Sequence, residues 1–203
     1  MSQRTQQTWA KEYESAERSL DEFLRSERAA QAIKAGDMAP AFHLRDGGAK
    51  SVSSDRLRQK GPLVVLFYRR AWCSCCAMAL AAIEQALPEF ADLGATVLAI
   101  SSHRPAQPIH DGDTLLRLGD PRNEVAAKFG LRRKLPERLI AAYKKLGINM
   151  SGFNDDESRT LSMPALYVIN KEGMVIYSEV HSDYATRVDP RGALMVLGAH
   201  KRR

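Results

Sequence analysis

No uninterrupted apolar segment of the chain approaches the roughly 18 residues that a membrane-spanning helix needs. The apolar run at residues 63–68, for example, has only the length of a β-strand. The first residues also lack the apolar centre of a secretory signal, because residues 2–11 are mostly polar. We therefore expect a cytoplasmic protein that has no membrane partner.

Cysteine is scarce, and its three copies, Cys73, Cys75 and Cys76, lie within four residues of one another. Such a cluster cannot form the distributed disulfide framework of small secreted domains. The five histidines show no helical metal-site spacing either. Clustered cysteines in a chain expected in the cytoplasm instead indicate redox chemistry or a thiolate metal site.

Charge of one sign is not concentrated anywhere, although the formal net charge is +6. Acidic residues interrupt almost every basic stretch, as where Glu137 follows residues 132–134. No basic-and-aromatic motif typical of nucleic-acid binding accompanies these charges. We predict a solvated surface, no nucleic-acid partner, and no cofactor or resident metal.

The sequence divides into an N-terminal helical extension, residues 1–35, and one domain, residues 36–203. The extension carries an irregular apolar stripe of helical spacing. The stripe consists of Trp9, Tyr13, Leu20, Phe23, Leu24 and Ile33. It would either pack on the core or contact a partner, and a homodimer is one option.

The domain reads as strand, helix, strand from residue 63 onward. The apolar run 63–68 suits a strand covered on both faces, and residues 95–100 suit a second buried strand. Between them, residues 80–90 carry an apolar stripe of helical spacing, which predicts a helix with a kink near Pro88. This order predicts a βαβ unit of an α/β fold with helices on both faces of the sheet. Further helices are expected at 120–129, 136–146 and 190–197, closed by Gly198, and a hairpin at 166–178.

The cysteines lie where the first buried strand gives way to the helix. Backbone N–H groups and the helix dipole at such a junction favour a thiolate, which is the reactive form. Cys73 and Cys76 have Cys-x-x-Cys spacing, which suits a reversible disulfide. Cys75 would form a strained ring with Cys76, so it is either a third thiol for exchange or a packed side chain.

Four segments resemble the alkyl hydroperoxide reductase and thiol-specific antioxidant family, in its peroxiredoxin-like branch. They are GDMAPAF at 36–42, FYRRAWCSCC at 67–76, DPRNEVA at 120–126 and MPALYVI at 163–169. Asp183, Tyr184 and Arg187 also match a short family pattern. The resemblance implies a thioredoxin-like, three-layer fold with a central mixed sheet.

The same resemblance implies roles for the cysteine segment. Cys76 corresponds to the peroxidatic cysteine, and Cys73 stands where typical peroxiredoxins have threonine or serine. Arg69 replaces a family proline. Pro164 stands where the family has an arginine, and it is similar to the proline of thioredoxins, which implies a cis peptide bond.

A positive charge near the thiol would stabilise the thiolate and polarise the O–O bond of a peroxide. Arg69 and Arg70 are the candidates to replace the missing arginine, although either could instead face solvent at the end of the strand. Trp72 would shield the cysteines from solvent. His103 is the histidine expected closest to the site, because strand ends border the site in open α/β folds.

The leading hypothesis is a thiol peroxidase in which Cys76 attacks a hydroperoxide and Cys73 resolves the product as a disulfide. A thioredoxin-type or low-molecular-weight thiol would then reduce the enzyme. Three alternatives stay open: a disulfide reductase with Cys73 as nucleophile, a carrier of a soft metal such as copper, and an interaction domain that uses the N-terminal helix.

Overall fold

A central seven-stranded sheet organises the computed structural model, which describes residues 3–26, 31–69, 74–103, 105–110, 112–147, 158–180 and 188–202. Its strand order is β2-β1-β5-β4-β3-β8-β9, and β6 and β7 form a separate antiparallel pair. The bounds are β1 His43–Arg45, β2 Ser51–Ser53, β3 Leu63–Phe67, β4 Thr96–Ser101, β5 Leu115–Gly119, β6 Arg132–Lys134, β7 Thr160–Ser162, β8 Ala165–Ile169 and β9 Val175–Val180.

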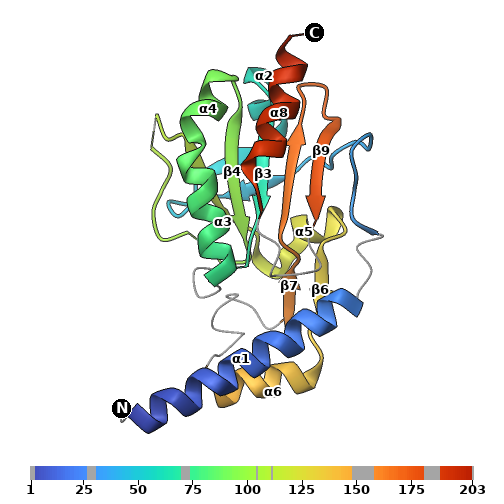
Figure 1. Cartoon of the computed structure of the whole chain (residues 1–203). Helices are drawn as coiled ribbons and strands as arrows, with labels where there is room; N and C mark the ends of the chain where they lie inside the picture. The colour runs from blue at the N-terminus through green and yellow to red at the C-terminus, as the bar shows by residue number, and fades with distance from the viewer. Residues whose placement is uncertain are drawn as a thin grey trace.

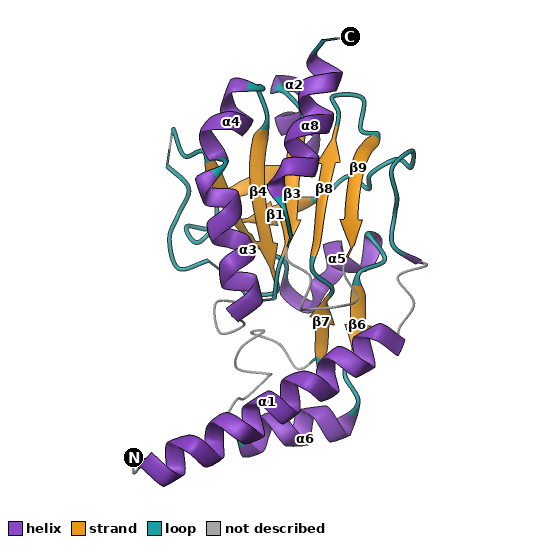
Figure 2. Ribbon diagram, viewed as in Figure 1, coloured by secondary structure: helices purple, strands orange, loops and turns teal. Residues whose placement is uncertain are grey.

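Helices cover both faces of this sheet (Figure 2). The bounds are α1 Gln3–Ser26, α2 Ser54–Lys60, α3 Ser74–Gln85, α4 Leu87–Asp92, α5 Glu124–Lys128, α6 Glu137–Lys145 and α8 Pro190–Lys201, with a 3-10 turn, η2, at Pro121–Asn123. α3, α4 and α8 share one apolar cluster with the sheet, whereas α2 and α5 belong to the cluster on the other face. None of these helices, within the described residues, is long and apolar enough to cross a membrane.

β3 lies at the centre of the sheet, parallel to β4 and antiparallel to β8. All five of its residues are buried, and they alternate between the two apolar clusters. Val64 and Leu66 face the layer of α3, α4 and α8, while Val65 and Phe67 face the opposite layer. The parallel pairing of β3 with β4 across α3 confirms the predicted βαβ unit.

The helix that follows β3 breaks close to the predicted kink. α3 ends at Gln85 and α4 begins at Leu87, with Pro88 in its first turn. Proline lacks an N–H group, so it fits the start of a new helix and not the middle of a continuous one. Phe90 of α4 is fully buried, so both helices pack on the sheet despite the break.

Several predicted boundaries were wrong. α1 ends at Ser26, and residues 32–35 are not helical, so the helix is shorter than the predicted extension of residues 1–35. The domain division at residue 35 stays a prediction. α8 runs through Gly198 to Lys201, because one interior glycine costs a helix only about 1 kcal/mol. The sequence did not predict β5, β6 and β7. β6 and β7 have only three residues each, and in β5 the exposed Arg117 interrupts the run of apolar residues.

The chain after α1 docks on the end of α5. The amide of Ile33 donates to the carbonyl of Phe129, and Gly130 has a φ of +71°. A Cβ atom on Gly130 would collide with the carbonyl group of Gln31. Gly147 has a similar φ of +76° but faces open space.

We expect Gly130→Ala to lower the free energy of unfolding by roughly 3 kcal/mol or more, because it adds a collision to the left-handed backbone strain. Gly147→Ala, the matched control, introduces only the strain and should cost about 1 kcal/mol. Denaturant unfolding of both variants measures the difference. Equal losses would show that the segment at Gln31 does not press on Gly130.

Candidate active site

The carboxyl ends of β3 and β4 and the amino end of β8 meet at one edge of the sheet. The Tyr68 amide donates to the Ile100 carbonyl at 3.0 Å, so the strand pairing continues one residue past β3. Phe67 pairs with Ala165 in the antiparallel register, which places Pro164 opposite Tyr68. The chain therefore leaves this edge at residue 69 and enters α3 at Ser74.

Cys76 lies in the first turn of α3, close to this edge, and is 2% exposed. Its side chain belongs to the apolar cluster that also contains Phe67 and Met163. Arg70, Trp72 and Cys73 lie outside the described residues, as does the side chain of Cys75. The predicted pairing of the cysteines with one another thus stays a prediction.

Arg69 is 2% exposed, so its side chain does not face solvent as one interpretation of the sequence allowed. Burial raises the pKa of Tyr143 on α6, and the positive charge of Arg69 partly offsets this rise. The first residue after the paired part of β3 is therefore buried. Its part in the reaction stays a prediction.

Tyr143 of α6 contacts the N-terminal helix. The ring is fully buried, and its hydroxyl donates to Glu17 Oε1 at 2.6 Å. Burial raises the pKa of Tyr143 strongly, and the negative charge and hydrogen bond of Glu17 raise it further. The tyrosine is consequently a fixed, protonated donor between α1 and α6.

Comparison with known proteins identifies the family. The model of the AhpC/TSA family matches residues 35–178, which include β1 to β8 and Cys76. The chain belongs to this family. It is therefore a thiol peroxidase of the peroxiredoxin type, as the sequence predicted.

Solved structures of peroxiredoxins share the fold. Peroxidoxin BcpB of Mycobacterium tuberculosis is 21% identical, with a TM-score of 0.61 over 82% of this chain and 97% of that one. The reduced 2-Cys peroxiredoxin of Plasmodium vivax is 17% identical, with a TM-score of 0.59 over 84% and 83%. AhpC of Mycobacterium tuberculosis is 17% identical, with a TM-score of 0.58 over 84% and 94%. No curated protein matches the sequence.

The thioredoxin-like fold predicted from the sequence is thus confirmed, but the cis bond expected at Pro164 is wrong. Every peptide bond among the described residues is trans. β7 ends at Ser162 and β8 begins at Ala165, so the chain passes almost straight from one strand to the next through Met163 and Pro164. A trans bond keeps this connection extended and is also the favoured isomer of X-Pro bonds.

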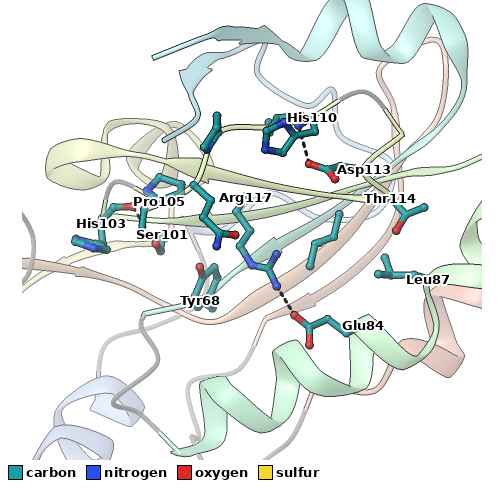
Figure 3. Close-up of a pocket in the computed structure, with 15 residues that line it drawn as sticks. Tyr68, Glu84, Leu87, Ser101, His103, Pro105, His110, Asp113, Thr114 and Arg117 are labelled. Carbon is teal, nitrogen blue, oxygen red and sulfur yellow. Dashed lines mark hydrogen bonds and ion pairs between the residues drawn. The ribbon is translucent and has the colours of Figure 1, made fainter. Parts of the chain in front are cut away.

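A cavity of about 690 Å³ opens beside the same edge, on the α3 side of the sheet (Figure 3). Tyr68 lines it, together with the proline-containing loop between β4 and β5. Arg117 and Glu84 form an ion pair within it, and the His110 amide donates to Asp113 Oδ2 at 2.8 Å. The sequence did not reveal this cavity, because its lining comes from separate segments that only the fold brings together.

His103 lines this cavity, in agreement with the expectation that it lies near the strand ends. Within the described part of the chain, no cluster of three or more His, Cys, Asp or Glu side chains could hold a metal ion. Asp183, Tyr184 and Arg187 lie outside the described residues. The described candidate site residues are thus the buried thiol of Cys76 and the buried Arg69, while Tyr68 and His103 line the cavity.

Two buried tyrosines of the family domain differ in their hydroxyl environment. Tyr143 donates to Glu17, whereas the Tyr167 hydroxyl on β8 has no hydrogen-bond partner among the described residues. Burial alone raises the pKa of Tyr167. We expect Tyr143→Phe to lower the free energy of unfolding by about 1–3 kcal/mol and Tyr167→Phe to leave it unchanged or raise it.

Thermal and urea unfolding of the two variants tests this contrast, and each serves as the other's control because both changes delete one hydroxyl from a buried ring. A larger loss for Tyr167→Phe would contradict the assignment of hydrogen bonds at both positions.

Proposed function

We propose that this peroxiredoxin-family enzyme reduces hydroperoxides through a Cys-x-x-Cys pair in which Cys76 attacks and Cys73 resolves. One observation carries the proposal: Cys76 occupies the first turn of α3 at the carboxyl end of the central strand, inside the residues that match the AhpC/TSA family. At this position backbone N–H groups of the first turn favour a thiolate.

The reaction balances in three steps. The Cys76 thiolate attacks one peroxide oxygen, the O–O bond breaks, and the other oxygen leaves with a proton as water or alcohol, which leaves Cys76 as a sulfenic acid. The Cys73 thiolate then attacks the Cys76 sulfur, and the sulfenic oxygen leaves as water. An external thiol couple supplies the two electrons that reduce the resulting disulfide.

Burial of Cys76 is compatible with its attack on a small peroxide. A side chain that is 2% exposed meets small peroxides more readily than a folded protein that carries a disulfide. The proximity of Cys73 in sequence would also allow the sulfenic acid to be trapped before a second peroxide reacts with it. We extend the proposal to a thioredoxin-type or low-molecular-weight thiol reductant in the cytoplasm, and to a homodimer as the form of the enzyme.

The Cys-x-x-Cys spacing on a thioredoxin-like fold favours one second candidate, a protein disulfide reductase. There Cys73 would attack a substrate disulfide and Cys76 would resolve the mixed disulfide. The trans bond at Pro164 removes one thioredoxin-like feature on which this candidate rested. The buried position of Cys76 suits either chemistry, so kinetics must separate them.

Peroxide titration of the cysteine variants tests the assignment. We expect the wild-type protein to lose two thiols for each molecule of hydrogen peroxide. Cys73→Ser should react at a similar initial rate but stop at a sulfenic acid, and Cys76→Ser should not react with peroxide. Stopped-flow fluorescence and mass spectrometry measure the rates and products. Cys75→Ser is the matched control, because it deletes a neighbouring thiol, and it should retain both steps.

Each alternative gives a different outcome in the same series. Peroxide consumption by Cys76→Ser at the wild-type rate would make the assignment of the attacking thiol wrong. Inert wild-type protein that reduces insulin disulfides efficiently would support the reductase. Copper retained through gel filtration, with neither activity, would support the soft-metal carrier.

Arg69 is the candidate to supply the positive charge of the site. We expect Arg69→Met to slow the reaction with peroxide by about 100-fold, because a buried cation at the reacting centre is lost, and Arg69→Lys to be intermediate. Arg56→Met is the control, since Arg56 is an exposed arginine of α2. An unchanged peroxide rate in Arg69→Met would exclude a role for this charge.

A further inference from the structure

Another cavity lies at the end of the sheet opposite to the cysteines. Its volume is about 270 Å³, and its lining includes the residues from which the chain enters β3 and β4. In Figure 1, α2, α4 and the end of α8 gather at this end of the molecule, while α1 and α6 lie at the other. β3, which runs between the two ends, has five residues and is about 17 Å long. The cavity shares no lining residue with the candidate active site.

Basic side chains dominate the charged part of this lining. Three lysines, Lys60, Lys171 and Lys201, line the cavity together with His200 and one carboxylate, Glu172. The other lining residues are glycine, proline and leucine, which carry no charge. Three lysines against one carboxylate leave an excess of two positive charges around one small concavity.

Contacts between separate segments hold the backbone of one lysine and the side chain of another in place. The Arg58 guanidinium of α2 donates to the Lys171 carbonyl at 2.7 Å, which joins the turn between β8 and β9 to α2. Lys201 Nζ of α8 donates to the Asp92 carbonyl at the end of α4, also at 2.7 Å. Four elements that are distant in the sequence are therefore fastened around the cavity.

Two glycines bring the connections that precede β3 and β4 into close contact. A Cβ atom on Gly61 would collide with the Gly94 carbonyl oxygen. Beside them, the Thr96 amide donates to the Pro62 carbonyl at 2.9 Å. The wall of the cavity is thus close-packed, so a ligand would meet a preformed site.

The positive charges at this cavity are not neutralised by ion pairs within the described part of the chain. The ion pairs there involve neither Lys60 nor Lys171, and Lys201 donates to a neutral carbonyl. Lys60 and Lys201 also lie in the last turns of α2 and α8, where cations complement the helix dipole. Lys171 lies in a turn, where no helix end favours a cation. An anion that binds between these groups would relieve their mutual repulsion.

We propose that this cavity binds a small anion that carries a phosphate group, which gives the protein a ligand site separate from its thiol site. Lysine is a common binder of phosphate, and a phosphate group carries close to two negative charges near neutral pH, which matches the excess of positive charge. The volume is just below the roughly 300–1,000 Å³ typical of ligand pockets, so the site suits phosphate with at most a small substituent. This inference goes beyond the proposed function and does not depend on it.

Titration of the full-length protein with inorganic phosphate and with phenyl phosphate tests the site. We expect both to shift the backbone amide signals of Gly61 and Gly94 in ¹H-¹⁵N spectra, while sodium chloride at the same ionic strength leaves them in place. Tighter binding of phenyl phosphate would identify a phosphate monoester as the ligand, because its ring can contact the leucines of the lining. Equal binding would identify free phosphate. Unmoved glycine signals with both compounds would overturn the proposal.

Charge variants tie the binding to named side chains. Lys60→Gln and Lys171→Gln should each weaken phosphate binding about tenfold, because each removes a charged hydrogen-bond donor. Glu172→Gln should strengthen it about threefold, since it removes the repelling charge, and a folding defect cannot produce this gain. Lys144→Gln is the matched control, because Lys144 is an exposed lysine in the last turn of α6, at the other end of the molecule.

Two further results would count against the site. Equal phosphate affinities in Lys60→Gln, Lys171→Gln and Lys144→Gln would show that these lysines serve only the fold. Weaker binding in Glu172→Gln than in the wild type would contradict the charge argument. Cys76→Ser should bind phosphate like the wild type, so a failure of the proposed peroxide chemistry leaves this test unaffected.

Discussion

The burial of β3 on both faces is the constraint on which the rest of the structure depends. A strand of five apolar residues has no side that tolerates water, so it must lie inside a sheet with a helical layer on each face. Its parallel partner β4 can be reached only by a crossover connection, and α3 with α4 supplies it. The start of α3 consequently falls at the carboxyl end of β3, and Cys76 lies in its first turn.

The same edge of the sheet also holds a buried charge. Arg69 follows Tyr68, the last paired residue of this strand, and is 2% exposed. Apolar packing by itself would exclude such a group, because the desolvation of a guanidinium is costly.

The chain combines features of two thioredoxin-like groups. Its family is AhpC/TSA, yet its Cys-x-x-Cys spacing is typical of thioredoxins, and the resemblance noted in the sequence implies that Arg69 and Pro164 stand where the family has a proline and an arginine. The register of β3 and β8 places Pro164 opposite Tyr68, the residue before Arg69. Arg69 and Pro164 are thus near one another at one sheet edge.

The sequence alone determined the elements whose signal is local. The run at 63–67, the helix break near Pro88, the hairpin around Gly173 and the family motifs could all be read from neighbouring residues, because strand burial, proline geometry and turn chemistry act over a few positions. The three-residue strands could not be predicted, since three residues are too few to show the alternation of apolar and polar side chains that is typical of a strand. Tertiary structure alone decided that Arg69 is buried, that Glu17 meets Tyr143 across 126 positions of sequence, and that the bond before Pro164 is trans. Each of these depends on which distant segments the fold packs together. The residues that neighbour an arginine or a proline in the sequence do not indicate which distant residues it will contact.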